Sequence, residues 1–89
     1  MDRILVSKVS ETIRNLRSQK RLSQEKLAEL SGLDRTYISG VERGIRNLTL
    51  ESLESIIIGL SVTPEEFFNA LTYKLSEGTL KDDGEEKST

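Results

Sequence analysis

The sequence contains no cysteine, no histidine and no tryptophan, and it has a single proline among its 89 residues. Without cysteine or histidine it has no disulfide, no thiolate or imidazole metal ligand, no cysteine nucleophile and no histidine general base. Acidic pairs occur, but no nucleophile paired with a base and no metal cluster accompanies them. We therefore expect no metal, no cofactor and no enzymatic activity.

Long apolar runs are absent as well. No stretch approaches the roughly 18 to 20 apolar residues of a membrane span. The first ten residues include the charged Asp2, Arg3 and Lys8, whereas a signal peptide needs a long apolar segment there. A chain this short supports one small core at most. We expect a soluble, cytoplasmic protein with no membrane partner.

The net charge of −2 and the pI near 5.2 do not by themselves indicate a nucleic-acid binder. The distribution along the chain differs from this average. Residues 1–46 hold ten basic and six acidic residues, whereas residues 47–89 hold three and nine. The chain is therefore polarised into a basic and an acidic half.

Apolar residues recur at helical spacing as far as residue 76, which predicts an all-α, five-helix fold. The first helix is expected over about residues 2–19. Each later helix begins at a side chain that can cap free amides, and these caps are Ser23, Asp34, Thr49 and Thr63. In the fourth helix the inward positions are expected to be Leu50, Leu53, Ile56, Ile57 and Leu60. Residues 77–89 are charged and lack periodicity, so we expect a domain over 1–76 and an acidic, disordered tail.

The second and third helices are short and are joined by a tight turn at Gly32, which is the sequence form of a helix-turn-helix. Any small helical bundle can contain such a corner. Gly32 and the small Ala28 therefore fit ordinary packing equally well.

The third helix carries guanidinium forks, hydroxyls and an aromatic donor, where a merely solvated face favours Glu and Lys. Its first turn would point deepest into a DNA major groove. We predict base contacts from Arg35, Thr36, Tyr37 and Ser39. Two alternatives stay open: Arg35 could form a surface ion pair, and Tyr37 could contact a phosphate or cover the edge of the second helix.

Donors on both sides of this helix could hold DNA phosphates. The predicted phosphate contacts are Gln24, Arg43, Arg46, Asn47, Thr49 and Arg17. Arg46 and Asn47 could instead form only a polar loop, and Arg17 could only complement a helix dipole. Gly40 weakens the third helix and indicates a close approach either to DNA or to the second helix.

The stretch LSQEKLAELSGLDRTYISGVERGIRNLTLESLESIIIGLSVTPEEFF resembles phage-repressor (XRE-type) helix-turn-helix domains. Within it, DRTYISGVERGIRNLTL resembles the controller proteins of restriction-modification systems. The resemblance implies a homodimer that binds an inverted-repeat operator in double-stranded DNA, with one recognition helix in each major groove. It also implies activation of its own and the endonuclease gene at low occupancy and repression at high occupancy. A repressor of phage or toxin-antitoxin type is the alternative within this class, and a protein-binding adaptor of the same fold is a second.

Two further surfaces are predicted. One module contacts few bases, so a two-fold dimer is expected, with a seam formed by Phe67, Phe68, Leu71 and Leu75 unless these side chains pack only in the core. Glu25 and Glu29 match the acidic patch with which some phage repressors contact RNA polymerase. We hypothesise that they contact the sigma subunit, although either could instead pair with Lys26 or Arg35.

Overall fold

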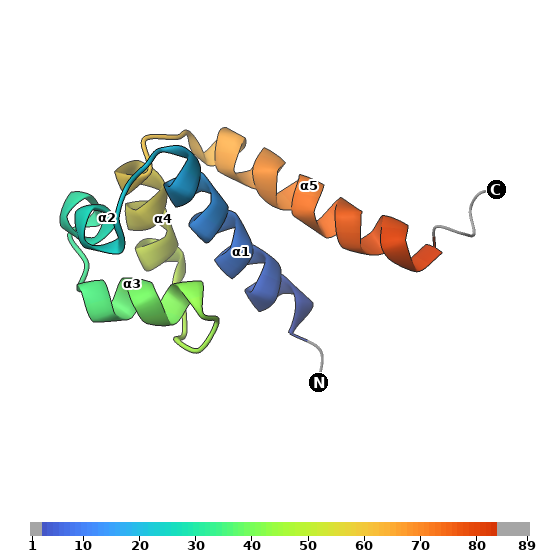
Figure 1. Ribbon diagram of the computed structural model, residues 1–89, viewed down its shortest axis with the longest axis horizontal. Coiled ribbons are helices and arrows are strands. Elements are labelled where there is room, and N and C mark those ends of the chain that lie inside the picture. The colour runs from blue at the N-terminus through green and yellow to red at the C-terminus, as the bar shows by residue number, and fades with distance from the viewer. Residues whose placement is uncertain (1–2, 84–89) are drawn as a thin grey trace.

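The computed structural model describes residues 3–83, with side chains as far as residue 77. Within this range the chain forms five α-helices and no strand (Figure 1). They are α1 (Ile4–Gln19), α2 (Gln24–Ser31), α3 (Arg35–Glu42), α4 (Leu50–Gly59) and α5 (Pro64–Asp83). The predicted all-α, five-helix fold is confirmed.

The helix starts follow from local capping chemistry. Ser23, Asp34, Thr49 and Thr63 each accept a hydrogen bond from a backbone N–H in the first turn of the helix that follows. At Thr63 the contact is reciprocal, because the carboxylate of Glu66 accepts a bond from the N–H of Thr63 at 2.8 Å. Four of the five helix starts are therefore encoded by single side chains.

The core lies where the helices converge, with α2 packed on α3 and α4, and with α1 packed along α5. Its buried apolar side chains come from all five helices: Ile13, Leu27, Ala28, Ile38, Val41, Leu53, Ile56, Ile57, Leu60, Phe67 and Leu71. Leu50 differs from expectation, since 83% of it is exposed. The cap at Thr49 places Leu50 in the first turn of α4, beyond the reach of the core.

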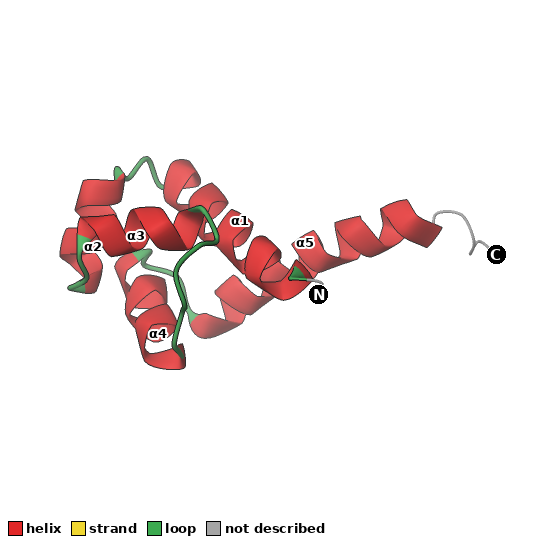
Figure 2. Ribbon diagram, turned by 90° about the horizontal axis from the view of Figure 1, so that it is seen from below, coloured by secondary structure: helices red, strands yellow, loops and turns green. Residues whose placement is uncertain are grey.

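Helix α5 is longer than the sequence predicts. It continues through Asp83, so the expectation of a disordered tail beginning at residue 77 is wrong for residues 77–83; residues 84–89 lie outside the described range. The extension projects past the other four helices, away from α2 and α3 (Figure 2). No helix in the described range is long and apolar enough to cross a membrane.

Candidate nucleic-acid interface

The corner between α2 and α3 is a tight, glycine-dependent turn. Gly32 adopts the left-handed conformation at φ 71°, and the N–H of Leu33 closes the end of α2 on the carbonyl of Ala28 at 3.0 Å. A Cβ at Gly32 would meet nothing within 4 Å, so backbone conformation rather than space requires glycine there. Asp34 then starts α3 two residues later. The corner places the first turn of α3 at the edge of the molecule.

The predicted base-contact residues lie on the outer side of α3. Arg35 and Thr36 are exposed, Tyr37 and Ser39 are half-buried, and Ile38 faces the core. Among the side chains that the structure describes, Arg35 forms no ion pair, so the alternative of a surface pair is not realised. Arg35 and Thr36 therefore protrude into solvent from the first turn of the helix.

Tyr37 connects α3 to the loop that follows it. Its hydroxyl donates a hydrogen bond to the carbonyl oxygen of Asn47 at 2.8 Å, and the guanidinium carbon of Arg46 lies 5.0 Å from its ring centroid. The second contact has cation-π geometry. Tyr37 therefore contacts the α3–α4 loop and also packs against the core, which includes Leu27 and Ala28 of α2. This loop keeps Arg46, Asn47 and Thr49 exposed on one side of α3.

Gly40 is buried, and the protein side chain closest to it comes from the α3–α4 loop rather than from α2. A Cβ built on it would overlap Cγ of Arg46 and would stand 3.2 Å from Cδ of the same side chain. Arg46 therefore covers the helix at Gly40. A glycine inside a helix indicates a close approach, but the sequence alone does not identify Arg46 as the neighbour, because this depends on the path of the α3–α4 loop.

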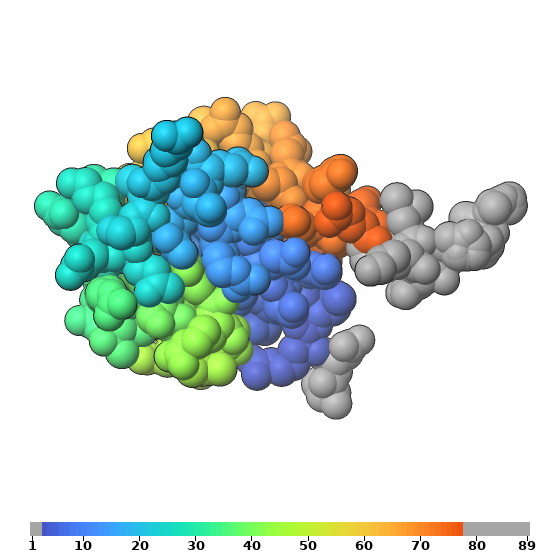
Figure 3. All heavy atoms as spheres, in the orientation of Figure 1, coloured from blue at the N-terminus to red at the C-terminus, as the bar shows by residue number. Residues whose placement is uncertain are grey.

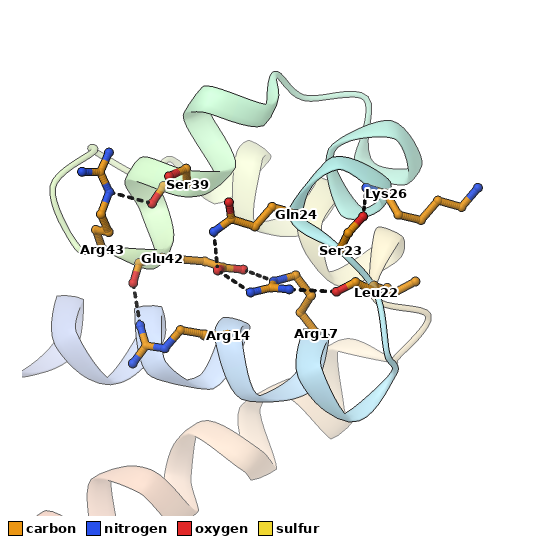
Figure 4. Close-up of polar contacts among 9 residues, drawn as sticks. All are labelled: Arg14, Arg17, Leu22, Ser23, Gln24, Lys26, Ser39, Glu42 and Arg43. Atoms are coloured by element: carbon orange, nitrogen blue, oxygen red, sulfur yellow. Dashed lines mark hydrogen bonds and ion pairs between the residues drawn. The ribbon is translucent and has the colours of Figure 1, made fainter.

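A buried carboxylate lies behind this face (Figure 4). Glu42 is 2% exposed, and its carboxylate accepts bonds from Nε of Arg17 at 2.6 Å, from Nη2 of Arg17 at 3.0 Å and from the amide of Gln24 at 3.0 Å. Nη1 of Arg17 donates to the carbonyl of Leu22 at 2.8 Å. These three bonds engage Arg17 with Glu42 and Leu22 inside the protein, so its guanidinium does not only complement a helix dipole. A phosphate contact from its two remaining N–H groups stays a prediction. Gln24 is half-buried at the start of α2.

Two donors from α1 bind the last carbonyls of α3. The hydroxyl of Ser10 donates to the carbonyl of Val41 at 2.7 Å, and Nη1 of Arg14 donates to the carbonyl of Glu42 at the same distance. The last carbonyls of a helix lack their usual intrahelical donors, and that of Val41 also accepts from the N–H of Gly44 at 3.0 Å. Arg43 follows them, and its Nε donates weakly to the carbonyl of Ser39 at 3.4 Å. The end of α3 is thus fastened to α1 while its beginning faces solvent.

The predicted dimer residues do not form one surface. Phe67 is fully buried and Leu71 is 6% exposed, so both belong to the core, as the α5 face that packs on α1 and α4 requires. Their assignment to a dimer seam is wrong. Leu75 is half-buried against the core, and Phe68 is 46% exposed. The sequence missed Leu50 and Ile58, which are exposed on α4; Leu50 and Phe68 line the same shallow hollow between α4 and α5.

The acidic residues of α2 lie on its outer side. Glu25 and Glu29 are both exposed, and Lys26 lies 3.5 Å from Glu29 in an exposed ion pair. The alternative of a pair with Lys26 is therefore realised for Glu29. No group of three or more carboxylates in the described part of the chain is gathered as metal ligands would be.

The sequence profile of the helix-turn-helix family matches residues 13–67, from the middle of α1 to the first turn of α5. Control protein C.SmaI of Serratia marcescens is 40% identical over 70 residues, covering 79% of this chain and 83% of that protein. The chain belongs to the helix-turn-helix control proteins of restriction-modification systems. The family resemblance of its sequence is thereby confirmed.

Solved structures agree with this membership. The wild-type restriction-modification controller protein C.Esp1396I superposes on this control-protein chain with a TM-score of 0.81 at 50% identity, covering 83% of this chain and 97% of that one. C.Esp1396I has also been solved as a tetramer in complex with its natural 35 base-pair operator. That structure matches with a TM-score of 0.80 at 51% identity, covering 82% of this chain and 96% of that one.

Proposed function

We propose that this protein is a sequence-specific DNA-binding transcriptional regulator, the controller of a restriction-modification system. The observation that carries the proposal is the exposed first turn of α3, where Arg35 and Thr36 protrude behind a glycine-dependent corner. Arg can bond bidentately to the O6 and N7 atoms of guanine, and Thr offers a hydroxyl and a methyl group. C.Esp1396I, which shares this fold, binds operator DNA.

The residues proposed to contact bases are Arg35, Thr36, Tyr37 and Ser39. The first two are exposed and the last two are half-buried. Because the hydroxyl of Tyr37 donates to Asn47, its oxygen is left to accept a hydrogen bond, for example from a base amino group. Ser39 lies one turn farther from the start of the helix and is half-buried, so it serves at the margin of the groove.

Phosphate contacts flank the groove on both sides. Arg43, Arg46, Asn47 and Thr49 lie after α3, and all four are exposed. Gln24 stands at the start of α2, where free backbone amides also attract an anion. Its side-chain amide donates one hydrogen bond to Glu42. The second amide N–H and the backbone N–H are the groups that could meet a phosphate. The two groups would hold the strands on opposite edges of one groove.

The functional unit is a homodimer on an inverted repeat, because one copy of α3 reads too few base pairs for genomic specificity. A second copy of this chain is the occupant that fits the apolar face of α4 and α5. Leu50 and Phe68 line this face at 83% and 46% exposure, and Ile58 is exposed on α4 at 67%. The surrounding charge is acidic, with Glu51 and Glu54 lining the same hollow, so the face is unsuited to DNA.

Regulation follows from occupancy and from the acidic face of α2. As the family resemblance implies, the dimer activates its own and the endonuclease gene at low occupancy and represses at high occupancy. Glu25 and Glu29 are exposed on α2 and would meet the basic sigma subunit of RNA polymerase at the promoter. Both lie on α2, outside the set assigned to base contacts.

The test is the affinity for a duplex recovered by selection from a random DNA pool, measured between about 50 and 200 mM salt. A protein that neutralises several phosphates loses affinity by decades over this range. We expect a steep loss and a palindromic selected sequence. Binding that is insensitive to salt, or selection that recovers no preferred sequence, would support a protein-binding adaptor instead.

A further inference from the structure

Gly40 lies in the middle of α3, on the side of the helix that carries the proposed DNA contacts. It follows Thr36 by four residues and Tyr37 by three, and residues at these spacings are neighbours on one helix face. Glycine is a poor residue for the middle of a helix, because it loses the most backbone freedom on folding. Its presence there calls for a compensating contact.

The compensating contact is with the side chain of Arg46. A Cβ at position 40 would overlap Cγ of Arg46, and it would lie 3.2 Å from Cδ and 3.3 Å from Cβ of that residue. These atoms form the stem of the arginine rather than its mobile end. The backbone next to Arg46 is fixed against α3, because the N–H of Ile45 donates to the carbonyl of Gly40 at 3.0 Å.

The other end of the same arginine is held by Tyr37. The guanidinium carbon lies 5.0 Å from the ring centroid, and the Tyr37 hydroxyl is itself bonded to the carbonyl of Asn47. Arg46 is exposed, and a free arginine would sample many rotamers. Here the stem of Arg46 packs on the backbone of Gly40, and its guanidinium lies against the ring of Tyr37.

We propose that Gly40 is a positioning residue that sets Arg46 for DNA binding. The inference rests on the proposed function and deepens it, since it assigns a role in affinity to a residue that offers no side chain to DNA. An alanine at position 40 displaces the arginine stem and releases the guanidinium from Tyr37. The arginine must then be ordered during binding rather than before it, and this lowers affinity.

The first arm of the experiment needs no DNA. Protons that lie over an aromatic ring resonate upfield, so the side-chain proton shifts of Arg46 report its contact with Tyr37. In Gly40→Ala and in Tyr37→Ala we expect these shifts to move to the values of a free arginine. The melting temperature of Gly40→Ala is expected not to fall sharply, because alanine is the better helix former. Unchanged Arg46 shifts in Gly40→Ala would overturn the proposal.

The second arm is a double-mutant cycle on the selected duplex at one salt concentration. Gly40→Ala and Arg46→Ala are each expected to lose about tenfold in affinity. The double variant should lose no more than Arg46→Ala alone, because both changes remove the same interaction. A loss from Gly40→Ala that persists in the Arg46→Ala background would overturn the proposal, since position 40 would then act on its own.

The two proposals fail in different ways. Wild-type protein that binds no duplex in a salt-dependent manner contradicts the proposed function. Wild-type protein that binds steeply, with Gly40→Ala binding equally well, leaves the function intact and removes only the role of Gly40. Ile45→Ala serves as the matched control, because it truncates an exposed side chain next to Arg46 in the same loop without placing an atom against that arginine.

Discussion

Arg17 and Glu42 face each other across 2.6 Å in the interior of the molecule, joining α1 to the end of α3 although 25 residues separate them in the sequence. Two parallel hydrogen bonds join them, one to each oxygen of the carboxylate, which is the bidentate geometry that guanidinium and carboxylate groups favour. With Glu42 only 2% exposed, neither group can be removed without leaving the other poorly compensated.

We expect Arg17→Ala to lower the free energy of unfolding by about 3 to 5 kcal/mol, because it leaves the carboxylate of Glu42 buried without its cation. Urea unfolding followed by circular dichroism measures this loss. Lys26→Ala is the control, since it breaks an exposed ion pair and should cost less than about 1 kcal/mol. Equal stability losses in the two variants would contradict the assignment of Arg17 to the core.

Arg35→Ala is expected to cost about 1 to 3 kcal/mol of binding free energy and to relax base preference at one position of each half-site. The reason is that a bidentate contact to a base edge discriminates among bases, whereas a phosphate contact does not. Repeating the selection with the variant protein measures the change. A uniform loss across all sequences would place Arg35 among the phosphate contacts.

Arg46→Ala should weaken all sequences alike and reduce the salt dependence of binding by roughly one phosphate contact. Titrations of the selected duplex and of a scrambled duplex at several salt concentrations measure both quantities. Loss of preference at a single base pair would instead move Arg46 into the base-reading set.

Leu50→Asp and Ile58→Asp should each shift the protein from dimer to monomer at micromolar concentration, because they place a charge on the apolar face of α4. Sedimentation gives the mass, and circular dichroism verifies that the fold is kept. Leu30→Asp, on exposed α2, is the matched control and should leave the mass unchanged. If both α4 variants keep the wild-type mass, the seam lies elsewhere.

Glu25→Lys combined with Glu29→Lys should keep operator binding and abolish activation of transcription, since both side chains are exposed and lie outside the set that contacts bases. In vitro transcription with purified polymerase measures activation, and a binding titration with the same protein verifies occupancy. Unchanged transcription would remove α2 from the polymerase contact.

The carboxylate of Glu11 couples α1 to α5. Partial burial raises its pKa, but the hydrogen bond and charge of Lys74, aided by Lys8, outweigh this effect, so the pKa of Glu11 lies below its ordinary value. Its stabilising contribution is therefore present above the ordinary pKa and is lost as the pH falls through the lowered one. We expect Glu11→Gln to lower the melting temperature by a few degrees near about pH 7 and to have little effect near about pH 3. Equal effects at both pH values would contradict this coupling.

The parts of the fold that sequence predicts are those governed by neighbouring residues. Caps such as Ser23 and Thr63 act within one turn, so their roles can be recognised from the residues around them. The exposure of Arg35 and Thr36 follows in the same way from the inward spacing of Ile38 and Val41. These predictions needed no knowledge of how the helices pack.

The errors at Leu50 and over residues 77–83 are local, whereas those at the proposed interfaces come from packing between segments. Periodicity placed Phe67 and Leu71 on an apolar face, but it does not say whether that face meets the chain's own core or a second copy. Arg17 looked free because its partner, Glu42, lies on another helix. Gly40 signalled a close approach, yet only the path of the α3–α4 loop identifies Arg46 as the neighbour. In each case the deciding contact joins segments that the sequence keeps apart.

Helices α2 and α3 form the side of the molecule that carries the proposed DNA contacts, and the orange-red part of α5 lies on the opposite side (Figure 3). The orientation of α3 is set by its contacts with α1. Ser10 and Arg14 bind the final carbonyls of α3, and these bonds oppose a rotation of the helix to fit an imperfect site. Such a rigid body docks with little rearrangement of its own. Any adjustment at the interface must come from bending or twisting of the duplex, and sequences that deform easily between the two half-sites would form the longest-lived complexes.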